Sequence, residues 1–244
     1  MTTDSETVSY YNSEAADAFI EGSATIPPDP LVGYCAETLQ QFSKISDVLC
    51  VDLGCGFGRQ LLDIANKFGA NATVVGFEQS PYLLSKADEL MHHGRVQLTD
   101  GRWIYVNGFT PGEELSDWDN IQLIHGDVLD LESHISSNSV DFINSNCTHL
   151  HLGAEDLSDA MNEVYRVLKP EGIMLLRMKT PIGNQTSRTR ADGRTEYYYS
   201  SEYWQSILES VGFEVIKVQA GDNLDVEYTK TSQFMAIVVR KISL

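Results

Sequence analysis

The chain has 244 residues, and 17 lysine and arginine side chains against 35 aspartate and glutamate side chains give a formal net charge of −18. Domains of about 100–250 residues bury enough apolar surface to fold without disulfide or metal staples, so a disulfide-scaffolded miniprotein is excluded. A hydrophobic share of 42% also excludes a disordered chain. The acidity disfavours a phosphate backbone as partner, because nucleic-acid-binding proteins carry a basic surface.

The sequence contains no signal for a membrane or for secretion. No apolar run approaches the roughly 20 residues that cross a bilayer, and the first residues lack the basic and apolar regions of a secretory signal. We therefore expect a cytoplasmic protein without a membrane partner. Four cysteines without a CxxC pair are expected to be reduced thiols and not zinc ligands: Cys35, Cys50, Cys55 and Cys147.

Short apolar runs alternate with helical patterns along most of the chain. Strands are expected at residues 48–52, 72–77, 121–125, 140–145, 173–178, 213–218 and 234–239. Helices are expected at residues 61–68, after the Ser80–Pro81 cap, at 157–168 and at 200–211. Strands that alternate with helices favour right-handed crossovers and a parallel sheet. The predicted fold class is α/β, in a single domain over residues 1–244.

Three segments interrupt this alternation. Residues 1–45 include a proline cluster that ends any helix there, and we expect them to form an N-terminal cap. Residues 92–120 contain Asp100-Gly101 between alternating stretches, which predicts a hairpin-bearing insertion. Its Trp103 and Tyr105 are candidates to cap an aromatic substrate or to pair two subunits. Residues 180–196 are expected to form a polar, lid-like loop, because long loops in compact domains are usually functional or mobile.

The most informative segment is the glycine-rich run at residues 52–58, Asp-Leu-Gly-Cys-Gly-Phe-Gly, between an expected strand and an expected helix. Its glycines allow a tight turn and the close approach of a ligand to the backbone. The GxGxG spacing differs from the GxGxxG of dinucleotide sites. Asp52 beside the loop suits a cationic amine or sulfonium better than a phosphate.

Two further carboxylates follow the next strands. Glu78 lies 20 residues beyond Gly58 at the end of the second strand, where a carboxylate can accept both hydroxyls of a ribose. Asp127 follows the third strand and can accept from an adenine amino group, while Val128 offers its backbone amide. Each alone is equally consistent with a solvated strand end or an ordinary turn, and the functional interpretation depends on their combination with the glycine loop.

Together these segments resemble the class I S-adenosylmethionine-dependent methyltransferases. Residues 52–58 resemble the first motif of that family, residues 76–80 the ribose motif with Glu78 in place of the commoner aspartate, and residues 126–131 the adenine motif. Residues 141–152 resemble the fourth-strand segment. Residues 163–172 resemble the helix and turn before the fifth strand, with Glu171 where glycine is usual. The resemblance covers roughly residues 45–240.

The resemblance implies a Rossmann-like three-layer sandwich whose seven-stranded, mostly parallel sheet has the order 3-2-1-4-5-7-6, with the last strand antiparallel. It implies S-adenosylmethionine as cofactor, S-adenosylhomocysteine as product, and in-line methyl transfer to an oxygen or nitrogen of a small-molecule acceptor, a class that includes natural products. Cofactor contacts are expected at Asp52, Gly54, Cys55, Gly56, Glu78, Gln79, Asp127, Val128 and Asn146. Residues 144–147 lack the Asn-Pro-Pro-Tyr motif of DNA and RNA methyltransferases, so nucleic acid is not expected as substrate.

The acceptor side is less specific. His149 and His151 are candidate bases, with packing at a helix start as the alternative for His151; a third metal ligand is missing, and no metal is expected. Candidate substrate-side residues are Tyr10, Tyr11, Thr148 and Arg194. The acidic net charge suggests an amine acceptor, whereas the arginines of the 180–196 segment suggest a carboxylate or phosphate. The acceptor stays open, and so does the oligomeric state, for which a homodimer is one alternative.

Two alternative functions also stay open. A non-methylating member of the same fold would bind the adenosyl cofactor and yield no methylated product. A nicotinamide-dependent oxidoreductase is disfavoured by the GxGxG spacing.

Overall fold

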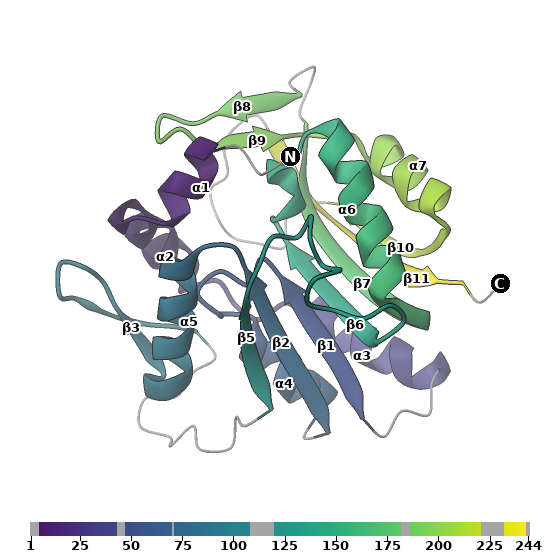
Figure 1. The fold of residues 1–244 in the computed structure, drawn as a ribbon, viewed down its shortest axis with the longest axis horizontal. Coiled ribbons are helices and arrows are strands. Elements are labelled where there is room, and N and C mark those ends of the chain that lie inside the picture. The colour runs from purple at the N-terminus through teal and green to yellow at the C-terminus, as the bar shows by residue number, and fades with distance from the viewer. Residues whose placement is uncertain are drawn as a thin grey trace.

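A computed structural model describes residues 5–42, 47–69, 71–107, 120–181, 186–220 and 232–242. At its centre is a seven-stranded sheet in the order β10-β11-β7-β6-β1-β2-β5 (Figure 1). Its strands are β1 (Val48–Leu53), β2 (Ala72–Glu78), β5 (Ile121–His125), β6 (Val140–Asn146), β7 (Leu168–Pro181), β10 (Phe213–Ala220) and β11 (Ser232–Lys241). When these seven strands are numbered 1 to 7 in chain order and the sheet is read from β5 to β10, this is the predicted order 3-2-1-4-5-7-6. Strand β11 is antiparallel to both of its neighbours. The α/β prediction is confirmed.

Apolar residues on alternate strand positions build two cores, one on each face of the sheet. In β1, Cys50 packs into the core that includes Val32 and Ile64, whereas its neighbour Val51 packs into the core that includes Met161 and Trp204. The covering helices are α3 (Pro30–Phe42), α4 (Leu61–Phe68), α6 (Ala154–Val167) and α7 (Ser201–Val211). Figure 1 shows α6 and α7 in front of the sheet and α3 and α4 behind it. No helix in the described ranges is long and apolar enough to cross a membrane.

A third apolar cluster lies outside the sheet and joins the N-terminal segment to the insertion. Leu83 and Leu90 of α5 (Pro81–His93) pack with Ile20 of α2 and with Val96 of the insertion. The short elements here are α1 (Ser5–Tyr11), η1 (Glu14–Ala16), α2 (Asp17–Ser23), β3 (Arg95–Gln97) and β4 (Trp103–Tyr105). β3 and β4 pair antiparallel around the expected turn, and residues 108–119 of the insertion lie outside the described residues.

The structure differs from the sequence prediction after α6 and in the 180–196 segment. β7 begins at Leu168, which pairs with Val140 across a bulge, and Glu171 adopts a left-handed φ of 66° within it. Beyond β7, which extends to Pro181, the expected loop contains a hairpin of β8 (Ser187–Thr189) and β9 (Thr195–Tyr197). Gly193 has a φ of 89° and closes the turn by donating its N–H to the Arg190 carbonyl (3.0 Å).

Candidate active site

A cavity of about 590 Å³ lies at the carboxyl ends of the central strands. The glycine loop and the end of β2 form one wall, and the α1–α2 segment forms another. The turn of the β8–β9 hairpin and the ends of β7 and β11 complete it. In Figure 1, α1 and the hairpin meet at the same edge of the sheet. The cavity therefore joins the glycine motif to the N-terminal and hairpin segments, which are far apart in sequence.

The glycine loop needs its glycines for conformation and for space. Gly54 and Gly56 have φ angles of 69° and 57°, and a Cβ on Gly54 would lie 2.1 Å from Thr148 Oγ1. The loop amides already have protein acceptors, because Gly54 N–H donates to the Phe77 carbonyl (2.7 Å) and Gly56 N–H donates to Glu78 Oε2 (3.0 Å). A pyrophosphate needs free N–H groups at such a turn. The loop thus does not offer the anion site of a dinucleotide-binding protein.

Glu78 is the principal acceptor on this side of the cavity. Its Oε1 accepts from Ser80 N–H (2.9 Å) and its Oε2 from Gly56 N–H, which fixes the carboxylate against the loop. Burial raises the pKa of Glu78. Each carboxylate oxygen has about two lone-pair sites, so Glu78 keeps capacity for further donors from a ligand. Gln79 and Val128 line the cavity beside it.

Two predicted carboxylates lie behind this wall and do not line the cavity. Asp52 is buried, its Oδ1 accepts from Asn144 Nδ2 (2.6 Å), and burial raises its pKa to about 7. Asn144 Nδ2 also lies 3.0 Å from Gln60 Oε1. Asp127 accepts from Gln79 Nε2 (3.0 Å) and from the Leu129 N–H (3.0 Å). Asp127 therefore positions Gln79, which lines the cavity, whereas Asp52 reaches the lining residue Gln60 only through Asn144.

The two histidines are placed differently. His149 does not line the cavity, its Nδ1 lies 2.7 Å from Ser145 Oγ, and burial lowers its pKa to about 4. His151 lines the cavity, and its Nδ1 lies 2.8 Å from the Thr195 carbonyl. Since a carbonyl only accepts, Nδ1 carries the proton and Nε2 keeps a lone pair. Burial also lowers the pKa of His151 to about 4, so the ring is neutral near pH 7.

Near these histidines, Asn146 and Thr148 line the cavity, and Thr148 Oγ1 donates to the Leu53 carbonyl (2.9 Å). The described residues contain no group of three His, Cys, Asp or Glu side chains that would hold a metal ion.

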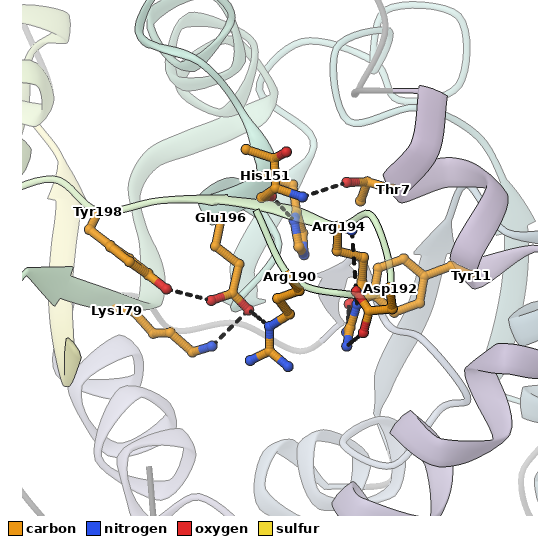
Figure 2. A network of polar contacts seen from close by, with 10 residues as sticks. Thr7, Tyr11, His151, Lys179, Arg190, Asp192, Arg194, Glu196 and Tyr198 are labelled. Carbon is orange, nitrogen blue, oxygen red and sulfur yellow. Dashed lines mark hydrogen bonds and ion pairs between the residues drawn. The ribbon is translucent and has the colours of Figure 1, made fainter. Parts of the chain in front are cut away.

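Arg194 connects the hairpin to the N-terminal helix. Its Nη1 donates to Tyr11 Oη (3.0 Å), its Nη2 pairs with Asp192 Oδ2 (2.8 Å), and its guanidinium lies 4.0 Å from the centre of the Tyr10 ring. Thr7 Oγ1 accepts a hydrogen bond from the backbone N–H of Thr195 (3.1 Å), as Figure 2 shows. Burial raises the pKa of Tyr11 to about 12. The three predicted residues Tyr10, Tyr11 and Arg194 therefore come together as one contact between α1 and the hairpin.

Glu196 is the centre of a second, buried network at the same end of the cavity. Its Oε1 pairs with Lys179 Nζ (2.9 Å) and lies 2.8 Å from Arg190 Nε, and its Oε2 accepts from Tyr198 Oη (2.8 Å) (Figure 2). Burial pushes the pKa of Glu196 up, but the neighbouring Lys179 and the hydrogen bonds outweigh it, and the pKa is lowered. An ionised carboxylate thus holds two cations at the cavity wall.

A family model described as a methyltransferase domain matches residues 51–176, which is more than half of the chain. The match spans the glycine loop, Glu78 and the cavity-lining end of β6. The chain belongs to the class I S-adenosylmethionine-dependent methyltransferases. S-Adenosylmethionine is the cofactor of this methyltransferase, and transfer of its methyl group is the reaction.

Solved structures agree on the fold of the methyltransferase. An S-adenosylmethionine-dependent methyltransferase from Methanosarcina mazei is 15% identical with a TM-score of 0.64, over 89% of this chain and 100% of that one. The [4+2]-cyclase SpnF is 16% identical with a TM-score of 0.67, over 100% of this chain and 97% of that one. The 1,6-didemethyltoxoflavin-N1-methyltransferase of Burkholderia thailandensis, solved with S-adenosylhomocysteine, is 14% identical with a TM-score of 0.63, over 98% and 87%. A search of curated proteins found no matching relative.

The wall around the glycine loop of the methyltransferase fits its cofactor. Glu78 presents a desolvated carboxylate with spare lone pairs. The space beside the Cα atom of Gly56 is open, because the nearest side chain, Phe19, lies 3.5 Å from the place where a Cβ would be. Gln60, which sequence reasoning missed, lines the cavity with a buried Nε2 that has no partner among the described residues. An amide donor and a carboxylate acceptor in one wall suit a zwitterionic ligand.

Sequence reasoning also missed the cations of β7. Arg177 and Lys179 both line the cavity, and Arg177 Nη2 pairs with Asp29 Oδ2 (2.5 Å). Their signal was present, because two cations at alternate positions end an otherwise apolar strand and therefore share a face.

Proposed function

We propose that this methyltransferase methylates an oxygen or nitrogen atom of a small molecule that binds in the cavity, with the reaction taking place in the cytoplasm. The observation that carries the proposal is the contact between α1 and the β8–β9 hairpin, both of which line the cavity. Its volume of about 590 Å³ lies in the range of small-ligand sites. Donor and acceptor share this space, which favours a small acceptor over a macromolecular surface.

The cofactor wall would work through a few groups of this chain. Glu78 would accept the ribose hydroxyls, Val128 would contact the adenine, and Gln60 Nε2 would donate to the methionine carboxylate. When bound, the cofactor supplies a methyl group on a sulfonium that is already a good leaving group. The protein then mainly aligns donor and acceptor, and well-oriented partners reach effective molarities of about 10⁵–10⁸ M.

On the acceptor side, His151 is the group best placed to orient the reacting atom. Its Nδ1–H is held by the Thr195 carbonyl, so Nε2 can accept a hydrogen bond from an acceptor O–H or N–H. With its pKa lowered to about 4, His151 is a weak base, and its role is to aim the acceptor lone pair at the methyl group. Thr148 and Tyr11 line the same space.

We also propose that residues 1–45 act as a cap and the hairpin within 180–196 as a lid. Ser80 Oγ donates to the Tyr11 carbonyl (2.6 Å) directly after the Glu78–Gln79 strand end, and Arg194 contacts the Tyr11 hydroxyl. Tyr11 therefore connects the cofactor wall to the hairpin.

The test begins with calorimetric titration of S-adenosylmethionine and S-adenosylhomocysteine into ligand-stripped protein, followed by a screen of small amines, phenols and acids for release of S-adenosylhomocysteine. Glu78→Ala should lose cofactor binding because it removes the carboxylate acceptor. Gly56→Val should lose it because its side chain fills the open space beside the glycine loop. Arg102→Gln, at an exposed residue that does not line the cavity, is the control. Unchanged affinity in both site variants would contradict the assigned cofactor wall.

A second candidate function is favoured by one comparison. SpnF, a [4+2]-cyclase, shares this fold over nearly its whole length, so a chain of this architecture can carry out another reaction. A non-methylating protein would bind both cofactor forms and release no S-adenosylhomocysteine with any acceptor in the screen.

A further inference from the structure

Several residues that line the cavity have a buried side-chain nitrogen without a hydrogen-bond partner within the described ranges. Among cavity-lining residues that the structure describes, three such atoms occur: Gln60 Nε2, Arg177 Nε and Arg190 Nε. Arg190 Nε lies 2.8 Å from Glu196 Oε1 without hydrogen-bond geometry, so this contact is an ion pair only. All three atoms are N–H donors, and leaving a buried donor unsatisfied destabilises a protein. These nitrogens are themselves buried, but the side chains of Arg177 and Arg190 are partly exposed, so a ligand that meets their remaining N–H groups must bring acceptor atoms.

The charges that line the cavity also differ from those of the chain. Five cationic side chains, Arg59, Arg177, Lys179, Arg190 and Arg194, line it together with four carboxylates, whereas the whole chain has about twice as many acidic as basic residues. One of these carboxylates is Glu78, on the cofactor wall. The part of the cavity next to β7 and the hairpin is therefore cationic.

Not all of these cations are equally available to a ligand. Arg194 is held by Asp192 and Tyr11, and Lys179 is held by Glu196. Within the described part of the chain, Arg177 has a single ion pair, from Nη2, and Arg190 has a single one, from Nε. A guanidinium has five N–H donors, so most donors of these two arginines have no protein partner there.

Two different elements bring these two arginines to the cavity. Arg177 lies in β7 in register with Asn146 of β6 and Ala236 of β11, all three lining the cavity, and so belongs to the sheet edge. Arg190 comes from the hairpin that covers this edge, and Figure 2 shows its terminal nitrogens directed away from Glu196. An oxyanion between the sheet and the hairpin would contact both.

We propose that the methyl acceptor carries an oxyanion, a carboxylate or a phosphate, that Arg177 and Arg190 bind. Planar guanidinium groups bind both kinds of oxyanion through paired N–H donors. This proposal rests on the proposed function, because it assigns the substrate class of the same cavity. Gln60, on the glycine-loop side, is left to satisfy the carboxylate of the cofactor itself.

The experiment measures the binding of simple probes to the full-length protein saturated with S-adenosylhomocysteine. Benzoate, phenyl phosphate and the neutral benzamide are titrated by calorimetry or ligand-observed NMR. Benzoate or phenyl phosphate should bind at least tenfold more tightly than benzamide, and the stronger of the two identifies the oxyanion. Equal binding of all three probes, or binding of none, would overturn the proposal.

Variants test the residues. Arg177→Gln and Arg190→Gln should each weaken the preferred anionic probe about tenfold and leave the affinity for S-adenosylhomocysteine unchanged. Arg190→Gln is the safer variant for folding, because Glu196 keeps Lys179 and Tyr198, whereas Arg177→Gln leaves the buried Asp29 without its ion pair. Arg95→Gln, an arginine stacked on Trp103 outside the cavity, is the matched control.

The outcomes separate this proposal from the proposed function. If both variants lose S-adenosylhomocysteine and the anionic probe in equal measure, the arginines bind the cofactor carboxylate and the inference is wrong. If the probes behave as expected while no acceptor releases S-adenosylhomocysteine, the anion site stands and the small-molecule methyl transfer fails instead.

Discussion

Replacing Gly54 by alanine tests the most constrained contact of the active site. An alanine at the φ of 69° found there loses about 1–2 kcal/mol to left-handed strain. Its Cβ would also lie 2.1 Å from Thr148 Oγ1, so Thr148 must move. Movement breaks the Thr148–Leu53 hydrogen bond of 2.9 Å, worth about 0.5–1.5 kcal/mol, and forces an unfavourable rotamer at a similar cost. We therefore expect Gly54→Ala to lower the free energy of unfolding by roughly 2–5 kcal/mol.

Two other glycines separate strain from crowding. Gly56 has a φ of 57°, and no atom lies closer than 3.5 Å to the place where a Cβ would stand; Gly101 has a φ of 87° with nothing within 4 Å. Alanine at either position should lose only the strain, about 1–2 kcal/mol. Urea unfolding of the three variants without cofactor measures the difference. Gly54→Ala should also abolish cofactor binding, whereas Gly101→Ala should leave it unchanged.

A double-mutant cycle then identifies the contact. Thr148→Ala removes Oγ1 and Cγ2, the two atoms nearest to the added methyl group, and leaves Thr148 Cβ at 2.8 Å. The double variant should therefore be more stable than the sum of the single effects predicts, by about 0.5–3 kcal/mol. The reasoning is refuted if the two changes are additive, or if Gly54→Ala is no more destabilising than Gly101→Ala.

Three further predictions concern the buried polar groups. Glu196→Gln should lower the free energy of unfolding by about 3–5 kcal/mol, measured by urea unfolding, because it leaves the buried Lys179 without its carboxylate; a loss under about 1 kcal/mol would contradict this. Burial raises the pKa of Asp52 from 3.8 to about 7, so its contribution to stability is full below about pH 4 and is lost as the pH rises through about 7. Urea unfolding should therefore show wild type losing stability relative to Asp52→Asn between about pH 4 and about pH 7, and a constant difference would disprove the shift. Arg194→Gln should weaken S-adenosylmethionine about tenfold in calorimetry by releasing α1, and Tyr11→Phe, which removes one hydrogen bond, about fivefold; unchanged affinity in both would exclude the cap.

The sheet order followed from the sequence because local signals and the motif agreed. Ser80 accepts from Leu83 N–H (3.0 Å) at the start of α5, with Pro81 in the first turn, as the cap pattern predicted. The missed hairpin shows the limit of the same approach. Asp192-Gly193 is a turn signal of the kind that predicted the β3–β4 hairpin, but the flanking strands are three residues each and polar. Their alternation is too short to be recognised in the sequence, and contacts with α1 and with η2 (His149–His151) hold them in place.

The candidate site was predicted in part for a similar reason. Gly54 and Glu78 lie where β1 and β2 end, so their spacing along the chain was enough to place them at the cavity. Asp52 is buried against Asn144 because the last four residues of β1 are buried on both faces of the sheet. The sequence shows that Arg177 and Lys179 share a face of β7, but the place of that face at the cavity depends on the pairing of β7 with β6 and β11, which local sequence does not encode.

The opposing charge cues, an acidic chain and a cationic cavity, act over different distances. A net charge of −18 spread over the surface repels an anion at long range, but salt at physiological strength screens exposed charges beyond about 8 Å. Inside the cavity the effective dielectric is lower, and Arg177 and Arg190 contact the ligand directly. The surface charge therefore affects mainly the rate of encounter and solubility, whereas the cavity lining decides which acceptor is held. Net charge is thus a poor guide to the acceptor of this methyltransferase, and the donors left without partners beside β7 are the better one.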